Sequence, residues 1–149
     1  MFGGNETMTM IRVLAGAAAV ALLATAVSAA EPMNLVGTWK STGDHAAVIY
    51  GDDNDHTPEA TTPMFREPSN AWTIVIKEQK GRAFHGVSVS PRGDEETIVG
   101  VINSKGDRML MAGDEAGLTG EILGETIEFC YQDHEDDRAA VACFVAAKE

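Results

Sequence analysis

Short runs of β-branched and apolar residues recur along most of the 149-residue chain, and most runs end at a turn that contains glycine. After residue 30 no stretch repeats its apolar residues with a helical period. Evenly spaced short strands with glycine turns are typical of antiparallel meanders that close on themselves. The sequence therefore predicts an all-β fold: an up-and-down meander that closes into a small barrel of eight or nine antiparallel strands.

The spacing of the turns predicts where the strands lie. The expected strands cover residues 35–41, 45–50, 71–78, 82–90, 95–103, 108–112, 117–123, 125–132 and 138–146. Residues 51–70, with three prolines and few residues suited to a core, separate the second strand from the third. A connection of this length without its own strand signals predicts one long loop, of the kind that often carries function.

Residues 12–30 have the composition of an export signal. Arg12 precedes an alanine-rich apolar run from Val13 to Val27, which small residues follow. This pattern predicts a secretory signal peptide over residues 1–30, cleaved after Ala29 or Ala30, that leaves residues 31–149 as a single barrel domain. The run is too short for a spanning helix, so we expect no membrane insertion and a periplasmic or secreted location.

The net charge of −12 limits the classes of partner. A strongly negative surface repels phosphate backbones and anionic lipid head groups, which argues against nucleic acids and membrane surfaces as partners. It attracts cations and basic proteins, although the same charge also serves solubility alone.

The chain's two cysteines predict a disulfide. Cys130 and Cys143 have twelve residues between them, which is not the spacing of a redox motif, and exported thiols are usually oxidised. If they face each other across a hairpin, Phe129 meets Phe144 and Tyr131 lies on the same inward face. The disulfide then lies on the outward face, where it closes a small loop and adds about 3 kcal/mol of stability.

Turn chemistry also predicts the register of the other hairpins. A turn centred on Lys80 and Gly81 pairs Ile76 with His85, and the next hairpin then places His85 beside Gly100 inside the barrel. A second turn, centred on Gly124 and Glu125, pairs Ile122 with Ile127, Gly120 with Phe129 and Leu118 with Tyr131.

The opening strand carries Gly37-Thr38-Trp39 within NLVGTWKS. A G-x-W motif there, followed by a meander of short strands, resembles the calycins, which include lipocalins and avidin-like proteins. The resemblance covers residues 31–149 in outline, and its specific motif is three residues long. It implies an eight-stranded barrel that holds a small, usually apolar ligand in its lumen, with Gly37 and Trp39 as structural residues and Trp39 closing the barrel floor. Trp72, the only other tryptophan, lies on a different strand from the biotin-site tryptophans of avidins, so biotin binding is not carried over.

Several small residues on the expected inward face indicate unfilled space, because a solid core prefers larger side chains. They are Ala83, Gly100, Ala112, Gly120, Ala142 and Ala146. Either the barrel is flattened or it holds a cavity, and a cavity with mixed aromatic and aliphatic walls suits a small molecule. The expected ligand-binding residues are Trp72, Ile74, His85, Gly100, Phe129, Tyr131 and Phe144. His85 either orients the ligand or is a hydrogen-bonded core histidine.

The sequence thus predicts non-covalent binding of a small hydrophobic or amphipathic molecule, with no cofactor. The alternative is a protein–protein module that inhibits a basic enzyme through acidic loops at 52–55 and 133–137, in the manner of periplasmic lysozyme inhibitors. No catalytic motif is present, so an enzyme is not expected; a barrel-type cyclase or isomerase is the alternative.

Two further features have competing interpretations. Asp52, Asn54 and His56 supply oxygen and nitrogen donors, but the segment lacks the glycine and the later glutamate of a calcium loop, so no metal site is expected. Val99, Val101, Met109 and Met111 are expected to face outward on neighbouring strands. Such an exposed apolar patch indicates either self-association or a face that the 51–70 segment covers.

Overall fold

The computed structural model describes residues 31–52, 58–67, 72–114, 116–135 and 137–149, and these contain nine β-strands and no helix. The predicted signal peptide lies outside the described residues. The strands are β1 (Gly37–Gly51), β2 (Ala60–Arg66), β3 (Thr73–Lys80), β4 (Ala83–Val89), β5 (Glu95–Ile102), β6 (Arg108–Ala112), β7 (Gly117–Leu123), β8 (Thr126–Glu135) and β9 (Arg138–Lys148).

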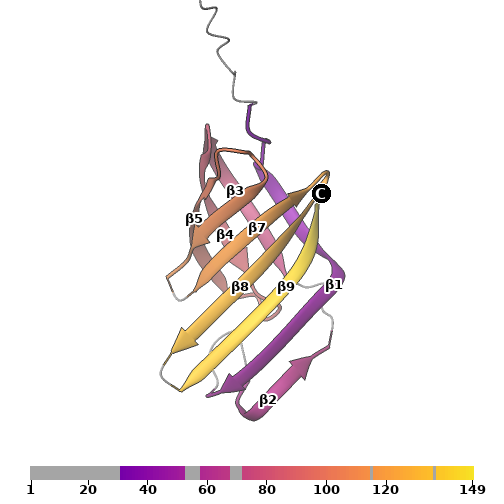
Figure 1. The fold of residues 1–149 in the computed structure, drawn as a ribbon, viewed down its shortest axis with the longest axis vertical. Coiled ribbons are helices and arrows are strands. Elements are labelled where there is room, and N and C mark those ends of the chain that lie inside the picture. Colours follow the sequence, from indigo (N-terminus) through magenta and orange to yellow (C-terminus); the bar gives the residue numbers. More distant parts are fainter. Residues whose placement is uncertain (1–30, 53–57, 68–71, 115, 136) are drawn as a thin grey trace, which may run out of the picture.

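Eight of the strands form a closed antiparallel barrel (Figure 1). Strands β3 to β9 pair in sequence order, and β1 pairs with both β3 and β9, which closes the barrel. The ninth strand, β2, pairs with the second half of β1. The prediction of an all-β meander that closes into a small barrel is confirmed.

The predicted loop at 51–70 is wrong in part, because it contains β2. Ala60 is the only buried residue of this strand, so no alternating apolar pattern marked it in the sequence. Pro63 is one of the three prolines that favoured a loop, but proline is tolerated at the edge of a sheet, where its missing N–H costs no ladder bond. β2 occupies such an edge position in the strand order.

The two strands predicted at 35–41 and 45–50 form one continuous strand, β1. An irregularity between Ser41 and His45 interrupts its pairing with β9, and Gly43 there has a φ of 95°. β1 pairs with β3 before this point and with β2 after it. The irregularity therefore lets the first part of β1 belong to the barrel and the second part belong to an extension of it.

One end of the barrel, which we call the closed end, is sealed by Trp39. Its side chain is 0% exposed and its indole N–H donates to the carbonyl of Leu35 at 2.8 Å. The ammonium of Lys148 lies 5.6 Å from the centre of the Trp39 ring. A side chain at Gly37, whose φ is 137°, would collide with Lys148. Gly37 thus leaves the space in which Lys148 packs over the tryptophan.

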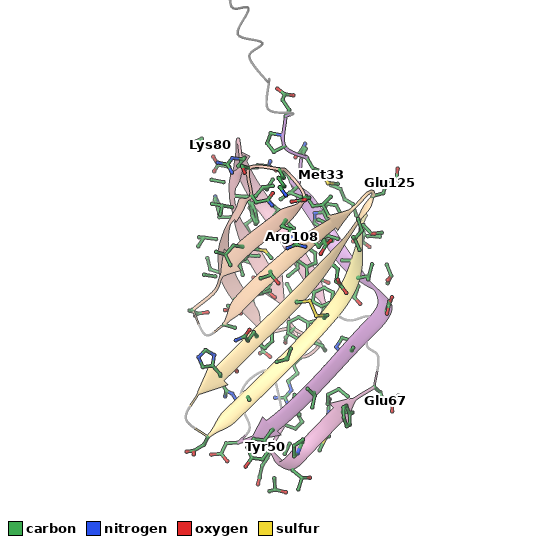
Figure 2. All side chains as sticks on the ribbon, viewed as in Figure 1. Met33, Tyr50, Glu67, Lys80, Arg108 and Glu125 are labelled. Atoms are coloured by element: carbon green, nitrogen blue, oxygen red, sulfur yellow. A yellow bond between two sulfur atoms is a disulfide. The ribbon has the colours of Figure 1, made fainter. Side chains whose placement is uncertain are left out.

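The opposite end, which we call the extended end, is built by three long strands and β2. The last pair between β7 and β8 joins Gly117 to Gln132, and β8 continues beyond it, paired only with β9. β9 in turn pairs with β1, which pairs with β2 (Figure 1). Figure 2 labels Tyr50 and Glu67 at this end, whereas Met33 and Lys80 lie at the other.

The predicted register between β3 and β4 is wrong by at least one residue. The turn is centred on Gly81 and Arg82, since Lys80 pairs with Ala83, and a bulge lies between Ile76 and Glu78. Because side chains alternate between the two faces of a strand, this shift reverses β4. Phe84 points into the barrel, and His85 points out of it.

β5 keeps its predicted face, with Ile98 and Ile102 buried and Val99 and Val101 exposed, but β6 is reversed. Ile102 pairs with Met109 and Gly100 with Met111, and both methionines are buried. Their predicted outward position is therefore wrong. The large outward hydrophobic residue of β6 is Leu110, which pairs with Val101 and is 65% exposed.

The predicted register of the last three strands is confirmed. Gly120 pairs with Phe129 and Leu118 with Tyr131 across the turn at 124–125. Cys130 faces Cys143, and the two form the predicted disulfide, with an S–S distance of 2.06 Å.

Candidate binding pocket at the extended end

The middle of the barrel is filled by large side chains. A side chain on Gly100 would collide with the ring of Phe84 and with Met111, and one on Gly120 would collide with Met109. These glycines were expected to leave empty space, but neighbouring side chains occupy it. Ala83 and Ala112, also expected inside, are exposed on the outer face. The predicted cavity is therefore not at these positions.

A cavity of about 130 Å³ lies at the extended end. We call it the end pocket. Three inward alanines, Ala47, Ala140 and Ala142, come from adjacent strands and form what we call the alanine floor. The remaining lining residues are His45, Ile49, Pro58, Arg66, Glu67, Trp72, Pro91, Tyr131 and Val141.

Aromatic rings form one wall of the end pocket. Trp72 stacks on Phe144 with a centroid separation of 5.9 Å, and its ring lies 6.1 Å from that of Tyr131. Phe129 packs behind them, 5.6 Å from Phe144. The carbonyl of Trp72 accepts a hydrogen bond of 3.0 Å from the backbone N–H of Ser41, which fixes the residue beside β1. This wall is therefore anchored to the barrel core on its far side.

A buried ion pair lies on the same inward face as Tyr131. Arg138 donates from Nε and from Nη2 to Oδ2 of Asp133, at 2.9 and 2.8 Å, and both residues are buried. The second carboxylate oxygen, Oδ1, is buried and has no hydrogen-bond partner among the described residues. A buried charge needs partners for its lone pairs, so this oxygen is an acceptor in need of a donor.

Tyr131 brings a polar atom to the pocket. The residue is 4% exposed, and its hydroxyl makes no hydrogen bond of good geometry among the described residues, although it lies near enough to the Asp133 carboxylate to interact with it. Burial raises the pKa of this hydroxyl, the negative charges of Asp133 and Glu96 and the contact with Asp133 raise it further, and Arg138 lowers it. The hydroxyl therefore keeps its proton at neutral pH. Nδ1 of His45 is likewise buried and unpartnered.

The turn between β4 and β5 forms another side of the end pocket. The Ser90 hydroxyl accepts hydrogen bonds from the N–H groups of Arg92 and Asp94, at 3.1 and 3.3 Å. This fixes the turn in which Pro91 lines the pocket. Glu96, just after the turn, is buried with its carboxylate against Gly113, where a side chain would collide with it.

The structure brings together two of the residues predicted to bind ligand, Trp72 and Tyr131, which both line the end pocket. Phe144 lies directly behind Trp72, and Ile74 and Phe129 are buried in the core. Gly100 is inside the barrel but covered by Phe84.

His85 does not belong to the pocket, and its predicted inward position is wrong. It is exposed on the outer face, where Nε2 lies 3.3 Å from a carboxylate oxygen of Glu78. The bulge in β3 and the shifted turn are the cause.

Sequence reasoning missed the part of the pocket that β1 supplies. His45, Ala47 and Ile49 alternate on one face of the strand, and they pair with Phe144, Ala142 and Ala140 of β9. The alternation was visible in the sequence, but turn chemistry gives no register for two strands so distant in the chain. Only the barrel closure brings these residues to Tyr131.

The acidic segments have a different arrangement from the one predicted. Asp133 was expected at an exposed tip, but it is buried in the ion pair with Arg138. Asp52 and Asp137 are exposed, and the N–H of Asp52 donates to the carbonyl of Asp137 at 3.4 Å. The two acidic segments therefore meet at the extended end.

Of the residues weighed as metal ligands, Asn54 and His56 lie outside the described residues, and Asp52 is exposed. Within the described ranges, no group of three histidine, cysteine or acidic residues is placed to hold a metal ion.

On the outer face, Val99, Val101 and Leu110 are exposed on adjacent strands. This patch replaces the one predicted with two methionines, and self-association through it stays a prediction. No helix in the described part of the chain is long and apolar enough to cross a membrane.

Comparisons with models of protein families, with curated proteins and with solved structures give no significant match. The closed antiparallel barrel agrees with the calycin resemblance at the level of the fold.

Proposed function

We propose that the protein binds a small amphipathic molecule non-covalently in the end pocket. The observation that carries this proposal is the Tyr131 hydroxyl, which is buried in a cavity walled by Trp72 and makes no hydrogen bond of good geometry within the described residues. Leaving a buried polar group unsatisfied costs about 1–3 kcal/mol, and a ligand that bonds to it removes that cost. Aromatic walls with few convergent polar atoms are the usual composition of a small-molecule site.

The size of the cavity limits the ligand. Small-molecule pockets usually enclose about 300–1,000 Å³, whereas an apolar cavity of about 150 Å³ holds a benzene ring. The end pocket, at about 130 Å³, therefore accepts roughly one ring or a chain of a few carbons. A larger ligand would place only one such group inside and project the rest past Arg66 and Glu67.

Binding at the end of the barrel refines the calycin-like expectation. The lumen of a hollow barrel would be the site in that family, but here Phe84, Met109 and Met111 occupy the middle. The alanine floor lies beyond them, on strands that extend past the barrel. An exported carrier or sensor of a small molecule fits this arrangement.

The test uses benzyl alcohol, which joins one ring to one hydroxyl, as the probe. Isothermal titration and ligand-observed NMR would measure its binding to the wild type and to Ala142→Val, which fills the floor. The matched control is Ala139→Val, on the same strand but on its exposed outer face. We expect binding to the wild type and to the control, and at least a tenfold loss in Ala142→Val, since two added methyl groups occupy much of so small a cavity. Equal binding to all three proteins would refute the proposal.

A second candidate function, inhibition of a basic enzyme, is favoured by one observation: Asp52 and Asp137 lie side by side and exposed. Together they offer negative charge to a basic partner such as a lysozyme. Replacing both with asparagine should then weaken inhibition, and added salt should weaken it in the unmodified protein. Unchanged inhibition in the double variant, or no inhibition by the wild type, excludes this candidate.

A further inference from the structure

Three buried atoms at the extended end make no hydrogen bond of good geometry within the described part of the chain, and all three can accept one. They are the Tyr131 hydroxyl, Oδ1 of Asp133 and Nδ1 of His45, and each is buried. A carboxylate oxygen only accepts hydrogen bonds, a hydroxyl accepts while it donates elsewhere, and one nitrogen of a neutral imidazole accepts. A ligand group with several N–H donors can donate to these acceptors. A ligand carboxylate only accepts hydrogen bonds, so it cannot.

The charges around Tyr131 also favour a ligand group that donates hydrogen bonds. The carboxylates of Asp133 and Glu96 both act on its hydroxyl, and the guanidinium of Arg138 opposes them. Two hydrogen bonds hold Arg138 to Asp133, so its positive charge is engaged in the buried ion pair. In a site shielded from water, such an excess of negative charge favours a cation and disfavours an anion.

The aromatic wall also suits a cation. Trp72 lines the pocket beside Tyr131, and an ammonium group over the face of an aromatic ring is attracted by the ring's quadrupole. The same rings pack against the apolar part of the ligand, so one wall can serve both ends of a short amine.

The exposed surface around the extended end carries negative charge as well. Asp52 and Asp137 are adjacent there, and Glu67 lies at the pocket itself beside Arg66. A field of this sign raises the local concentration of cations and speeds their association.

We infer that the ligand of the end pocket is a small primary amine, bound as its ammonium ion, with a single ring or a short alkyl chain. The inference rests on the proposed function and specifies its ligand. The ammonium donates to the Tyr131 hydroxyl and to Nδ1 of His45, and the hydroxyl directs its own proton toward Asp133. The ring or chain lies on the alanine floor against Trp72.

The experiment compares three probes that share a ring and differ in charge: benzylamine, benzyl alcohol and benzoate. Titration calorimetry at pH 7 and physiological ionic strength gives the affinity of each for the wild-type protein. A hydrogen bond to a charged donor is about twice as strong as a neutral one, so we expect benzylamine to bind about tenfold more tightly than benzyl alcohol. Benzoate should bind most weakly.

Three variants test the assignment of residues. Tyr131→Phe retains the ring and removes the hydroxyl, so the preference for benzylamine over benzyl alcohol should fall to within about threefold. Ala142→Val should remove benzylamine binding, which distinguishes the pocket from general attraction to an acidic surface. Asp133→Asn should lower benzylamine affinity alone, but it leaves Arg138 without its ionic partner. The decision therefore rests on Tyr131→Phe, with thermal unfolding used to confirm that each variant is folded.

Different failures separate the two proposals. If benzyl alcohol or benzoate binds the wild type as tightly as benzylamine, and Ala142→Val abolishes that binding, the amine inference is overturned and the pocket remains. If Ala142→Val binds every probe as the wild type does, or if no probe binds, both proposals fail. Benzylamine selectivity that Tyr131→Phe leaves unchanged overturns the assignment of the hydroxyl.

Discussion

The two ends of the barrel are built on opposite principles. At the closed end Trp39 is fully buried, its indole N–H is bonded to Leu35, and Lys148 packs over its ring. At the extended end the buried residues include Glu96, Asp133 and Arg138, and among the described residues three buried polar atoms make no hydrogen bond of good geometry. The first arrangement maximises packing, and the second retains polar atoms at a cost in stability.

This difference indicates that the two ends of the barrel have different roles. A closed, fully satisfied core gives the barrel its stability, and the extended end can then tolerate groups that only a bound molecule would satisfy. Proteins commonly carry such unsatisfied or strained groups where they bind or react. The account therefore expects mutations at the two ends to affect different properties.

The largest difference should come from the two tryptophans. Trp39→Ala removes a fully buried side chain at the closed end and should lower the free energy of unfolding by about 3–5 kcal/mol. Trp72→Ala removes a half-buried side chain and should cost less than half as much. Urea denaturation of both variants measures this. Equal losses would show that the extended end supports the fold as much as the closed end does.

The next effect concerns the buried ion pair. Asp133→Leu removes the carboxylate to which Nε and Nη2 of Arg138 donate and should cost about 3 kcal/mol, because breaking a buried ion pair by removing one partner is strongly unfavourable. Asp133→Leu combined with Arg138→Met should recover most of that loss, since apolar residues of similar volume can replace such a pair. A double variant no more stable than the single one would contradict this account of the pair.

A smaller effect should appear at alkaline pH. Folding raises the pKa of Tyr131, so the folded protein keeps this proton above pH 10, where the unfolded chain loses it. The stabilisation is complete below about pH 10, and above it the free energy of unfolding should fall by up to about 1.4 kcal/mol per pH unit.

Tyr131→Phe should remove this part of the pH dependence. Tyr50→Phe, which alters the exposed tyrosine, should leave it unchanged. Denaturation curves between pH 9 and pH 11 provide the measurement. If Tyr50→Phe instead removed the fall in stability with pH, the assignment of this pH dependence to Tyr131 would be wrong.

The sequence predicted the barrel and the register of its last two hairpins because some strands specify their own register. In β8 the apolar residues Ile127, Phe129 and Tyr131 alternate with polar ones, and Gly124 marks the turn, so one face alone suits the core. β4 is ambiguous: its seven residues, AFHGVSV, place small and apolar side chains on both faces. Register is weakly specified in such strands, and a bulge in β3 then decided it.

The end pocket was only partly predictable for a different reason. Trp72 and Tyr131 could be assigned to the interior from their own hairpins. The alanine floor, however, depends on the pairing of β1 with β9, where Ala47 meets Ala142. Their separation along the chain leaves no turn from which to read the register. The burial of Asp133 also follows from this closure, because β9 and β1 carry the sheet past the end of β7.

The most direct test of the central claim uses the indole N–H signals of the two tryptophans, one at each end of the barrel. Benzylamine would be titrated into ¹⁵N-labelled protein, with Trp72→Phe used to assign the two signals. The account predicts a saturable shift of the Trp72 signal with the Trp39 signal unmoved, and loss of that shift in Ala142→Val. A shift of Trp39 alone, or no saturable shift at either end, would contradict a binding site at the extended end.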